Sequence, residues 1–584
     1  MDTIQQTLEA RLHAAVGDSS GIFVSVQSAT DARFGDYQSN VAMQLAKVRK
    51  ANPRAVAQEI IAKIQIADLC DAPEIAGAGF INFRLKPAAL EAHFAALSRD
   101  ARLGTPEPAN PRTFVVDFSS PNVAKPMHVG HIRSTILGDA LARTARFVGH
   151  RVVTDNHIGD WGTQFGILCL AWKTQLDQQA LASDPISELE RIYKLQTERG
   201  KADPAEAEAA RAELVKLQAG DEENLGIWRE MQRLSQTQFD TIYARLGIQF
   251  DHTLGESFYN PWLRDVVADL VAKNIARESA GAICVFSDGL VPEKDDPFLI
   301  KDKEGWQPAP AMVQKADGAS NYTTTDLATL GYREREFAPS EVLYVTDGRQ
   351  QLHFRQLFAI WRRWQPASTM KLAHVWFGSI LGDDGKPFKT RSGETVKLAG
   401  LLDEAEQRAF AVVTEKSPEL PEADRREVAR IIGLGAVKYF DLQSNRQSDY
   451  IFSWDKMLSF QGNTAPYLQY SYVRCRAILR KAAETEVELS DAPVRLTEPG
   501  ELALAKKVAQ FGEIVPTVLD DYRPNLLCNY LFELASTFHS FFEACPVLKA
   551  EEPTRSSRLL LCDTTARVLR QGLDLLGITA PEKM

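Results

Sequence analysis

A succession of strand, loop, helix and strand between residues 113 and 155 is the feature that most constrains the fold of this chain. TFVVDF is short and rich in β-branched residues, which is typical of a buried strand. VGHIRSTILGDALARTARFVG has helical periodicity and ends at Gly149, and HRVVTDN is typical of a second strand. Two strands joined through a helix run parallel. The sequence therefore predicts an α/β domain built on a parallel sheet.

The same pattern returns after a long interruption. Residues 341–364, EVLYVTDGRQQLHFRQLFAIWRRW, predict a strand, a loop and a helix, and HVWFGSIL at 374–381 predicts another strand. Residues 170–250 lie between the two halves and are helical and strongly charged. We interpret them as a helical insertion that splits the sheet domain.

A chain of 584 residues is too long for one hydrophobic core, so several domains are expected. The first hundred residues predict a small α/β module, and the proline-rich stretch 98–113 predicts a linker. From about residue 420 onward the pattern is almost wholly helical. We therefore expect domains at 1–105, 106–405 and 406–584.

Composition excludes several classes of protein. No apolar run approaches the roughly 18–20 residues that span a bilayer, and no basic and apolar secretory signal opens the chain. The seven cysteines are scattered without a Cys-x-x-Cys pair, so we expect neither a disulfide framework nor a cysteine zinc site. The net charge of −10 does not indicate a protein that coats nucleic acid. We expect a cytoplasmic protein without membrane association.

The loop SPNVAKPMHVGH at 120–131 carries the clearest chemical signal. His128 and His131 stand three apart at the expected start of a helix, so both lie on one face beside unpaired backbone N–H groups. Gly130 lets a ligand approach the backbone, and Lys125 adds a cation. This combination favours a site for phosphate oxygens. A zinc pair and two merely packed histidines are the alternatives, and the zinc pair has no further ligand spaced nearby.

Other segments make the signal specific. A proline-containing loop that ends in His-x-Gly-His resembles the signature of class I aminoacyl-tRNA synthetases and their nucleotidyltransferase relatives. TDNHIGDWGTQFG, NYTTTDLATL, QGNTAPYLQYSYVR and the terminal LGITAPEKM look like arginyl-tRNA synthetases in particular, as do RFGDYQSNVAMQLAK and GFINFRL near the start. The resemblance covers the chain from about residue 30 to its end.

This resemblance implies a split Rossmann-like catalytic domain, an additional amino-terminal domain that binds the tRNA elbow, and an all-α anticodon-binding domain. It also implies ligation of L-arginine to tRNA(Arg) through an arginyl-adenylate, with release of AMP and pyrophosphate. ATP would enter with Mg²⁺, no zinc or other bound metal is expected, and a monomer is expected. The family further implies that arginine activation needs bound tRNA. The rivals are another class I synthetase, such as a cysteinyl enzyme, and a non-catalytic tRNA-binding paralogue.

The substrate guanidinium is planar and always charged, so paired carboxylates would hold it best. Asp117 and Asp326 are the candidates, although both are also typical capping residues. The resemblance adds Asn122, Tyr322 and Gln350 to the arginine site. For ATP it implies these residues: His128, Gly130, His131, Gly159, Asp160, His353 and Lys389.

A second signature loop of the family grips the leaving phosphates with lysines. The matching segment here, KPFKTRSGETVKL at 386–398, has Lys389 and Arg391 but lacks a clean second lysine. The resemblance implies that Lys125 stands in, and we count His128, His131, Lys125 and Lys389 as catalytic. The alternative is a solvated turn.

The expected tRNA contacts lie mainly near the carboxyl end. Tyr467, Tyr470 and Arg474 fall on one helical stripe with Lys481, an arrangement that suits stacking on unpaired bases. Core tyrosines with a solvated arginine are the alternative. The resemblance adds Met584 near the anticodon, and Tyr37, Gln38 and Asn82 at the tRNA elbow.

Overall fold

The structure is a computed structural model that describes residues 1–17, 21–29, 31–388, 396–483 and 494–584. The chain divides into two compact units. Unit 1 comprises residues 1–109, 412–443 and 455–584, and unit 2 comprises residues 110–411 and 444–454. The first crossing between them falls inside the predicted linker. The finer division into three domains stays a prediction.

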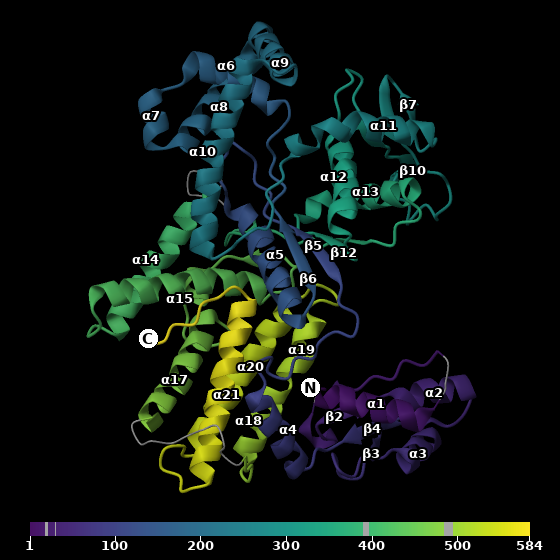
Figure 1. Cartoon of the computed structure of the whole chain (residues 1–584), viewed down its shortest axis with the longest axis vertical. Coiled ribbons are helices and arrows are strands. Elements are labelled where there is room, and N and C mark those ends of the chain that lie inside the picture. Colours follow the sequence, from purple (N-terminus) through teal and green to yellow (C-terminus); the bar gives the residue numbers. More distant parts are fainter. Residues whose placement is uncertain (18–20, 30, 389–395, 484–493) are drawn as a thin grey trace. The chain divides into compact units, whose positions relative to one another are not determined.

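A parallel sheet forms the centre of unit 2 (Figure 1). Its order is β13 (Lys371–His374), β12 (Glu341–Tyr344), β5 (Thr113–Asp117) and β6 (Arg151–Asp155), with every neighbouring pair parallel. Helix α5 (Val129–Val148) connects β5 to β6, and α13 (Gln351–Trp364) connects β12 to β13. The two predicted halves thus meet at the β5–β12 pair, which confirms the split α/β fold.

The predicted strand at 374–381 is wrong in its position. The sheet strand β13 ends at His374, and the chain then turns away to form β14 (Ile380–Leu381), which pairs with β15 (Tyr450–Ile451). Asp449 accepts a hydrogen bond from the Ser379 amide at 2.6 Å and holds this turn. A partner from a distant segment redirects the chain, and an apolar sequence pattern does not reveal such a partner.

The predicted helical insertion is confirmed. Its helices are α6 (Gln164–Gln175), α7 (Gln178–Ser183), α8 (Pro185–Ala202), α9 (Pro204–Gln218) and α10 (Glu222–Leu246). An aspartate caps the amino end of each of the last four, namely Asp177, Asp184, Asp203 and Asp221. These caps satisfy amide groups that a helix start would otherwise leave unpaired. The bundle is drawn in blue in Figure 1.

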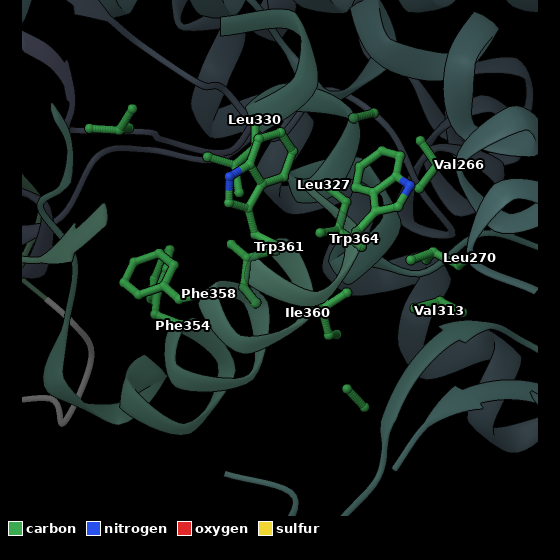
Figure 2. Close-up of a cluster of buried hydrophobic side chains, with 14 of the residues drawn as sticks. Val266, Leu270, Val313, Leu327, Leu330, Phe354, Phe358, Ile360, Trp361 and Trp364 are labelled. Atoms are coloured by element: carbon green, nitrogen blue, oxygen red, sulfur yellow. The ribbon is translucent and has the colours of Figure 1, made fainter. Parts of the chain in front are cut away.

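A second inserted region precedes β12. It contains η2 (Glu256–Trp262), α11 (Leu263–Ala272), β7 (Ala276–Ser279), β8 (Ala282–Val285), β9 (Leu299–Asp302), β10 (Gly305–Pro308), β11 (Ala311–Gln314) and α12 (Tyr322–Phe337). Phe354, Phe358, Trp361 and Trp364 recur at helical spacing along α13 and pack in one buried cluster with Leu327 and Leu330 of α12 and Leu270 of α11 (Figure 2). This cluster fixes α12, which carries predicted site residues.

Unit 1 combines a small α/β portion with a helical portion. The first contains α1 (Ile4–Val16), β1 (Gln27–Ser28), η1 (Ala32–Phe34), β2 (Tyr37–Ser39), α2 (Val41–Arg49), α3 (Pro53–Lys63), β3 (Glu74–Ala76), β4 (Phe80–Phe83) and α4 (Pro87–Arg99). Its sheet is antiparallel in the order β1-β2-β4-β3.

The helices that follow the sheet domain are α14 (Leu398–Lys416), α15 (Glu422–Leu442), α16 (Trp454–Met457), α17 (Ala465–Ala483), α18 (Pro499–Ala509), α19 (Phe511–Thr517), α20 (Asn525–Ala544) and α21 (Thr554–Leu575). All seven cysteines are buried and free. Within the described ranges, every helix is too short or too polar to cross a membrane.

Unit 1 also contains a buried carboxyl group whose ionisation opposes folding. Glu513 of α19 accepts hydrogen bonds from the Tyr37 hydroxyl at 2.9 Å and from the Gln5 amide at 3.1 Å. Burial raises the pKa of Glu513 from 4.5 to about 7. The folded state therefore binds a proton more tightly than the unfolded state, and this stabilisation is lost as pH rises from 4.5 through 7.

We expect Glu513→Gln to flatten the pH dependence of unfolding. The difference between a pKa of 4.5 and one of about 7 corresponds to about 3 kcal/mol between pH 4.5 and 8. Thermal unfolding midpoints measured across this range should therefore fall less in the variant than in the wild type. Glu419→Gln, at an exposed position, is the matched control and should follow the wild type. If the midpoint fell equally in Glu513→Gln and in the wild type, the raised pKa of Glu513 would be contradicted.

Candidate active site

The carboxyl ends of the four parallel strands align polar side chains in one row. Asp155 of β6 is in register with Asp117 of β5, Asp117 with Tyr344 of β12, and Tyr344 with His374 of β13. Open α/β sheets bind ligands beyond the carboxyl ends of their strands. The loops that follow these residues include the histidine loop and the segment HIGDWG at 157–162. The row therefore marks the candidate site.

The two signature histidines cap the helix that they begin. His128 is the N-cap of α5, and its side chain accepts the Gly130 amide proton at 3.0 Å through Nδ1. His131 Nδ1 accepts the His128 amide proton at 3.1 Å. The Val129 amide donates to the Val396 carbonyl at 2.9 Å. The prediction of unpaired backbone N–H groups at this helix start is therefore wrong, because these groups already have acceptors.

Capping fixes which ring nitrogen of each histidine carries a proton. Burial, followed by the Arg349 charge, lowers the pKa of His128, and burial lowers the pKa of His131 to about 3. Both rings are neutral at pH 7, and since each Nδ1 accepts a hydrogen bond, each proton lies on Nε2. The rings lie side by side with centroids 3.9 Å apart. The pair presents two neutral N–H donors.

The surroundings of His128 and His131 bear on whether these residues bind an anion, hold zinc or merely pack. Both side chains are half-buried, and neither Nε2 bonds to a residue that the structure describes. In the described part of the chain, no group of three or more histidine, cysteine, aspartate or glutamate side chains could hold a metal ion. Gly130 is needed for the cap itself, because a Cβ there would lie 2.9 Å from the His128 ring. The arrangement suits anion binding.

Helix α12 brings together residues expected to bind two different substrates. Asp326 lies inside the helix, one turn after Tyr322, and Asn321 is the N-cap, so Asp326 does not cap this helix. A short hydrogen bond of 2.6 Å joins Asp326 Oδ2 to His353 Nε2 of α13. The Tyr322 ring stands edge-on to His353 at 4.8 Å and is 59% exposed. These three residues form one cluster at the strand ends.

Asp117 already holds a guanidinium that belongs to the protein. Its Oδ2 accepts a hydrogen bond from Arg333 Nη2 at 2.7 Å, and its Oδ1 accepts one from the Ser120 hydroxyl at 3.1 Å. The carboxylate is buried. Arg333 Nη2 donates equally to Asp155 at 2.7 Å. Asp117 therefore lies at the predicted place, but it already has a guanidinium partner inside the protein, which it shares with Asp155.

Asp160 is a buried support of its loop. It accepts hydrogen bonds from the Ser257 amide and hydroxyl at 2.8 and 2.6 Å and from Gln232 Nε2 at 2.6 Å. Only 2% of Asp160 is exposed, and burial raises its pKa. The carboxylate of Asp160 is therefore enclosed and occupied, and its contact with ATP stays a prediction.

Asn122 and Gly159 form a second support of the same loops. They pair as an isolated parallel bridge, and a Cβ at Gly159 would lie 2.2 Å from Asn122 Oδ1. Asn122 is exposed, as is Gln350 in the short helix η3 (Gly348–Gln350) at the start of α13. Both stay available to a ligand.

Two residues near the site were not among the predictions. Glu256 follows a glycine at the start of η2, and its amide donates to the Ile158 carbonyl at 3.1 Å. Burial, together with the charges of Asp326 and Asp160 and against the opposing effect of His157, raises the pKa of Glu256 to about 7. Arg349 is a highly exposed cation whose charge acts on His128. No sequence spacing singles out either residue; only the fold brings them to the strand ends.

Lys125, in the first signature loop, is a predicted catalytic cation whose position is described. Lys125 Nζ lies 5.0 Å from the Tyr193 ring centroid of α8. Lys389 and Arg391 lie outside the described residues. The end of their loop is anchored, because the Leu398 amide donates to the Met127 carbonyl at 2.9 Å. Residues 396–398 are thereby fastened beside the histidine cap.

The predicted tRNA-contact residues divide by burial. In unit 1, Tyr467, Tyr470 and Arg474 surround His539, with ring centroids 5.4 and 6.4 Å away for the tyrosines and a 3.1 Å contact for Arg474. Tyr470 is 43% exposed. Met584 is half-buried at the end of the chain.

Three predicted contacts lie in the small α/β portion, at Tyr37, Gln38 and Asn82, and they stay predictions. Tyr37 and Asn82 are only 3% and 5% exposed, whereas Gln38 is half-buried. Tyr37 donates its hydroxyl to Glu513 inside unit 1. The side chains of Tyr37 and Asn82 therefore belong to the packed interior of the unit.

Comparisons with known proteins agree with this geometry. Residues 94–454 match the family model described as "tRNA synthetases class I (R), catalytic domain", residues 2–85 the "Arginyl tRNA synthetase N terminal domain", and residues 468–584 the "DALR anticodon binding domain". The chain is 49% identical over 565 residues to an arginine–tRNA ligase of Synechococcus sp., covering 95% of this chain and 94% of that one. It is 46% identical over 590 residues to that of Chromobacterium violaceum, covering both chains fully.

Solved structures give the same result. The arginyl-tRNA synthetase of Plasmodium falciparum has a TM-score of 0.83 at 29% identity, and that of Thermus thermophilus 0.82 at 26%, each covering 100% of both chains. The family models, the relatives and the two solved structures all indicate the same family. The chain therefore belongs to the class I arginyl-tRNA synthetase family.

Proposed function

We propose which residues of this chain carry out the reaction of its family, the ATP-dependent attachment of L-arginine to tRNA. In the first step the arginine carboxylate attacks the α-phosphorus of ATP, and pyrophosphate leaves. In the second step the arginyl group moves from the adenylate to a ribose hydroxyl of tRNA, and AMP leaves. The observation that carries the proposal is the histidine cap, which holds two neutral Nε2–H donors side by side.

His128 and His131 bind the phosphate oxygens of ATP through these donors. Negative charge on those oxygens shifts as the bond to pyrophosphate breaks, and fixed donors stabilise it without reorganising. The cap keeps each Nδ1 turned to the helix, so the donors are held before ATP arrives. ATP enters as its Mg²⁺ complex, and no zinc takes part. Lys125 and Lys389 supply cations for the leaving phosphates, with Arg349 a further candidate.

The arginine substrate binds along α12. Asp326 accepts its guanidinium, with Tyr322 beside it and Glu256 as a second carboxylate near enough to act on Asp326 electrostatically. Asn122 and Gln350, both exposed, hold its backbone groups. Lysine carries the charge but not the planar fork of donors, so it would leave buried acceptors unpaired. His353 orients Asp326 through their 2.6 Å hydrogen bond.

The tRNA contacts proposed for the helical portion are Tyr467, Tyr470, Arg474 and Met584. Support comes from the aromatic and cationic stripe around His539, with the Tyr470 ring exposed for stacking. We propose that the enzyme is a monomer, since one chain supplies all the side chains named for both substrates. We also propose the cytoplasm, the site of protein synthesis, as its location.

We expect His128→Asn to lower kcat for aminoacylation by about 10²–10³-fold, the usual effect of removing one such donor. Asparagine is a favoured N-cap, so it replaces the capping acceptor while removing the Nε2–H donor. The thermal midpoint and tRNA affinity should stay unchanged, which separates catalysis from folding and from binding. Wild-type aminoacylation by this variant would refute the assignment.

Asp326→Asn should raise KM for arginine about 10- to 100-fold, because a hydrogen bond to a charged group contributes about 1.5–3 kcal/mol. KM for ATP should not change. Glu336→Gln, exposed on the same helix, is the control and should leave both KM values at wild type. Equal effects on the two substrates would place Asp326 outside the arginine site.

Tyr470→Ala should weaken tRNA binding by about 5- to 150-fold, since stacking on one base contributes about 1–3 kcal/mol. Tyr470→Phe keeps the ring and should bind like the wild type. Both affinities are measured at one fixed salt concentration, because tRNA binding depends strongly on salt. Unchanged binding by the alanine variant would exclude stacking at this position.

A further inference from the structure

Arg333 is a fully buried cation beneath the candidate arginine site. It lies on α12, and none of its side chain is exposed. Its Nη2 donates to Asp117 Oδ2 and to Asp155 Oδ2, each at 2.7 Å. The guanidinium also lies over the Tyr344 ring, 5.4 Å from its centroid. Burying a charge is costly unless partners compensate it. Here the two carboxylates and the ring compensate it in part, since Nε and Nη1 of Arg333 have no hydrogen-bond partner among the described residues.

The two aspartates belong to neighbouring strands. Asp117 ends β5 and Asp155 ends β6, and they are in register. The loop after Asp117 leads to the His128 cap, and the loop after Asp155 leads to Gly159 and Asp160. One guanidinium therefore ties the roots of both loops to a single helix.

That helix also carries the residues proposed to bind arginine. Asp326 precedes Arg333 by seven residues, two helical turns, so both side chains project from the same face. Any shift of α12 against β5 and β6 would move Asp326 relative to the histidine cap. Arg333 thus lies where it can set the distance between the two substrate sites.

We propose that Arg333 is a positioning residue for arginine recognition. It fixes Asp326 and Tyr322 relative to the strand ends, and by bonding to Asp117 in the interior it leaves the substrate guanidinium to Asp326. The inference rests on the arginine site proposed above. It predicts that a change at Arg333 acts on arginine more than on ATP, because the donors for ATP are held by the α5 cap, whose hydrogen bonds do not involve α12.

The test compares Arg333→Met with the double variant Arg333→Met/Asp155→Asn in the full-length enzyme. The first leaves two buried carboxylates side by side, and the second leaves one, so the second should recover part of the thermal midpoint that the first loses. Both should raise KM for arginine about 10-fold or more, since small misplacements near a reacting group can cost up to 10²-fold, while KM for ATP stays near wild type. Arg335→Met, exposed on the same helix, is the matched control.

The inference is overturned if either Arg333 variant, folded at the assay temperature, has a wild-type KM for arginine. It is also overturned if KM for ATP rises as much as KM for arginine, since a purely structural defect would affect both. Asp326→Asn serves as the reference. If that variant leaves KM for arginine unchanged, the proposed arginine site itself is wrong; if only the Arg333 variants leave it unchanged, the positioning role alone fails.

Discussion

The amide protons of Gly130 and His128 are accepted by the Nδ1 atoms of His128 and His131, and the chemistry of the site depends on these two hydrogen bonds. A histidine in solution exchanges its proton between two nitrogens and is partly charged near neutral pH. Here burial keeps both rings neutral, and the cap assigns both protons to the outer nitrogens. A helix start usually binds anions through its own amides. In this chain the amides orient the imidazoles instead, and the cap leaves their Nε2–H donors unused.

The acidic side of the site follows a related principle, in which the protein satisfies some charges itself and leaves others for a ligand. Asp117 and Asp155 share Arg333 in the interior, whereas Asp326 is hydrogen-bonded to the ring of His353 of α13. A carboxylate with a fixed guanidinium partner gains little from a second one. The two predicted acids therefore differ in what they can offer a substrate, although they are the same residue type at comparable positions.

Much of the fold could be predicted because its signals are local. The short apolar runs within 113–117 and 341–344 predicted the parallel strands, and the periodicity of 170–250 predicted the helical insertion. The misplaced strand at 374–381 failed for a non-local reason, the Asp449 side chain that holds Ser379. The candidate site shows the same contrast between local and non-local signals. His128 and His131 belong to one contiguous motif, but the pairing of Asp117 with Arg333 joins residues more than two hundred positions apart, and Glu256 reaches the site only through the packing of η2.

Burial separates the predicted site residues into two groups, although their residue types alone gave no reason to separate them. A side chain that binds a ligand must keep polar atoms accessible to water before the ligand arrives, because an unpaired polar atom in the interior is costly. Asn122, Tyr322, Gln350 and Tyr470 meet this condition, since each is exposed. Asp160, Tyr37 and Asn82 do not, and the first two have their hydrogen bonds inside the fold. The buried members still affect function, because they set the geometry of the loops and helices on which the exposed members stand.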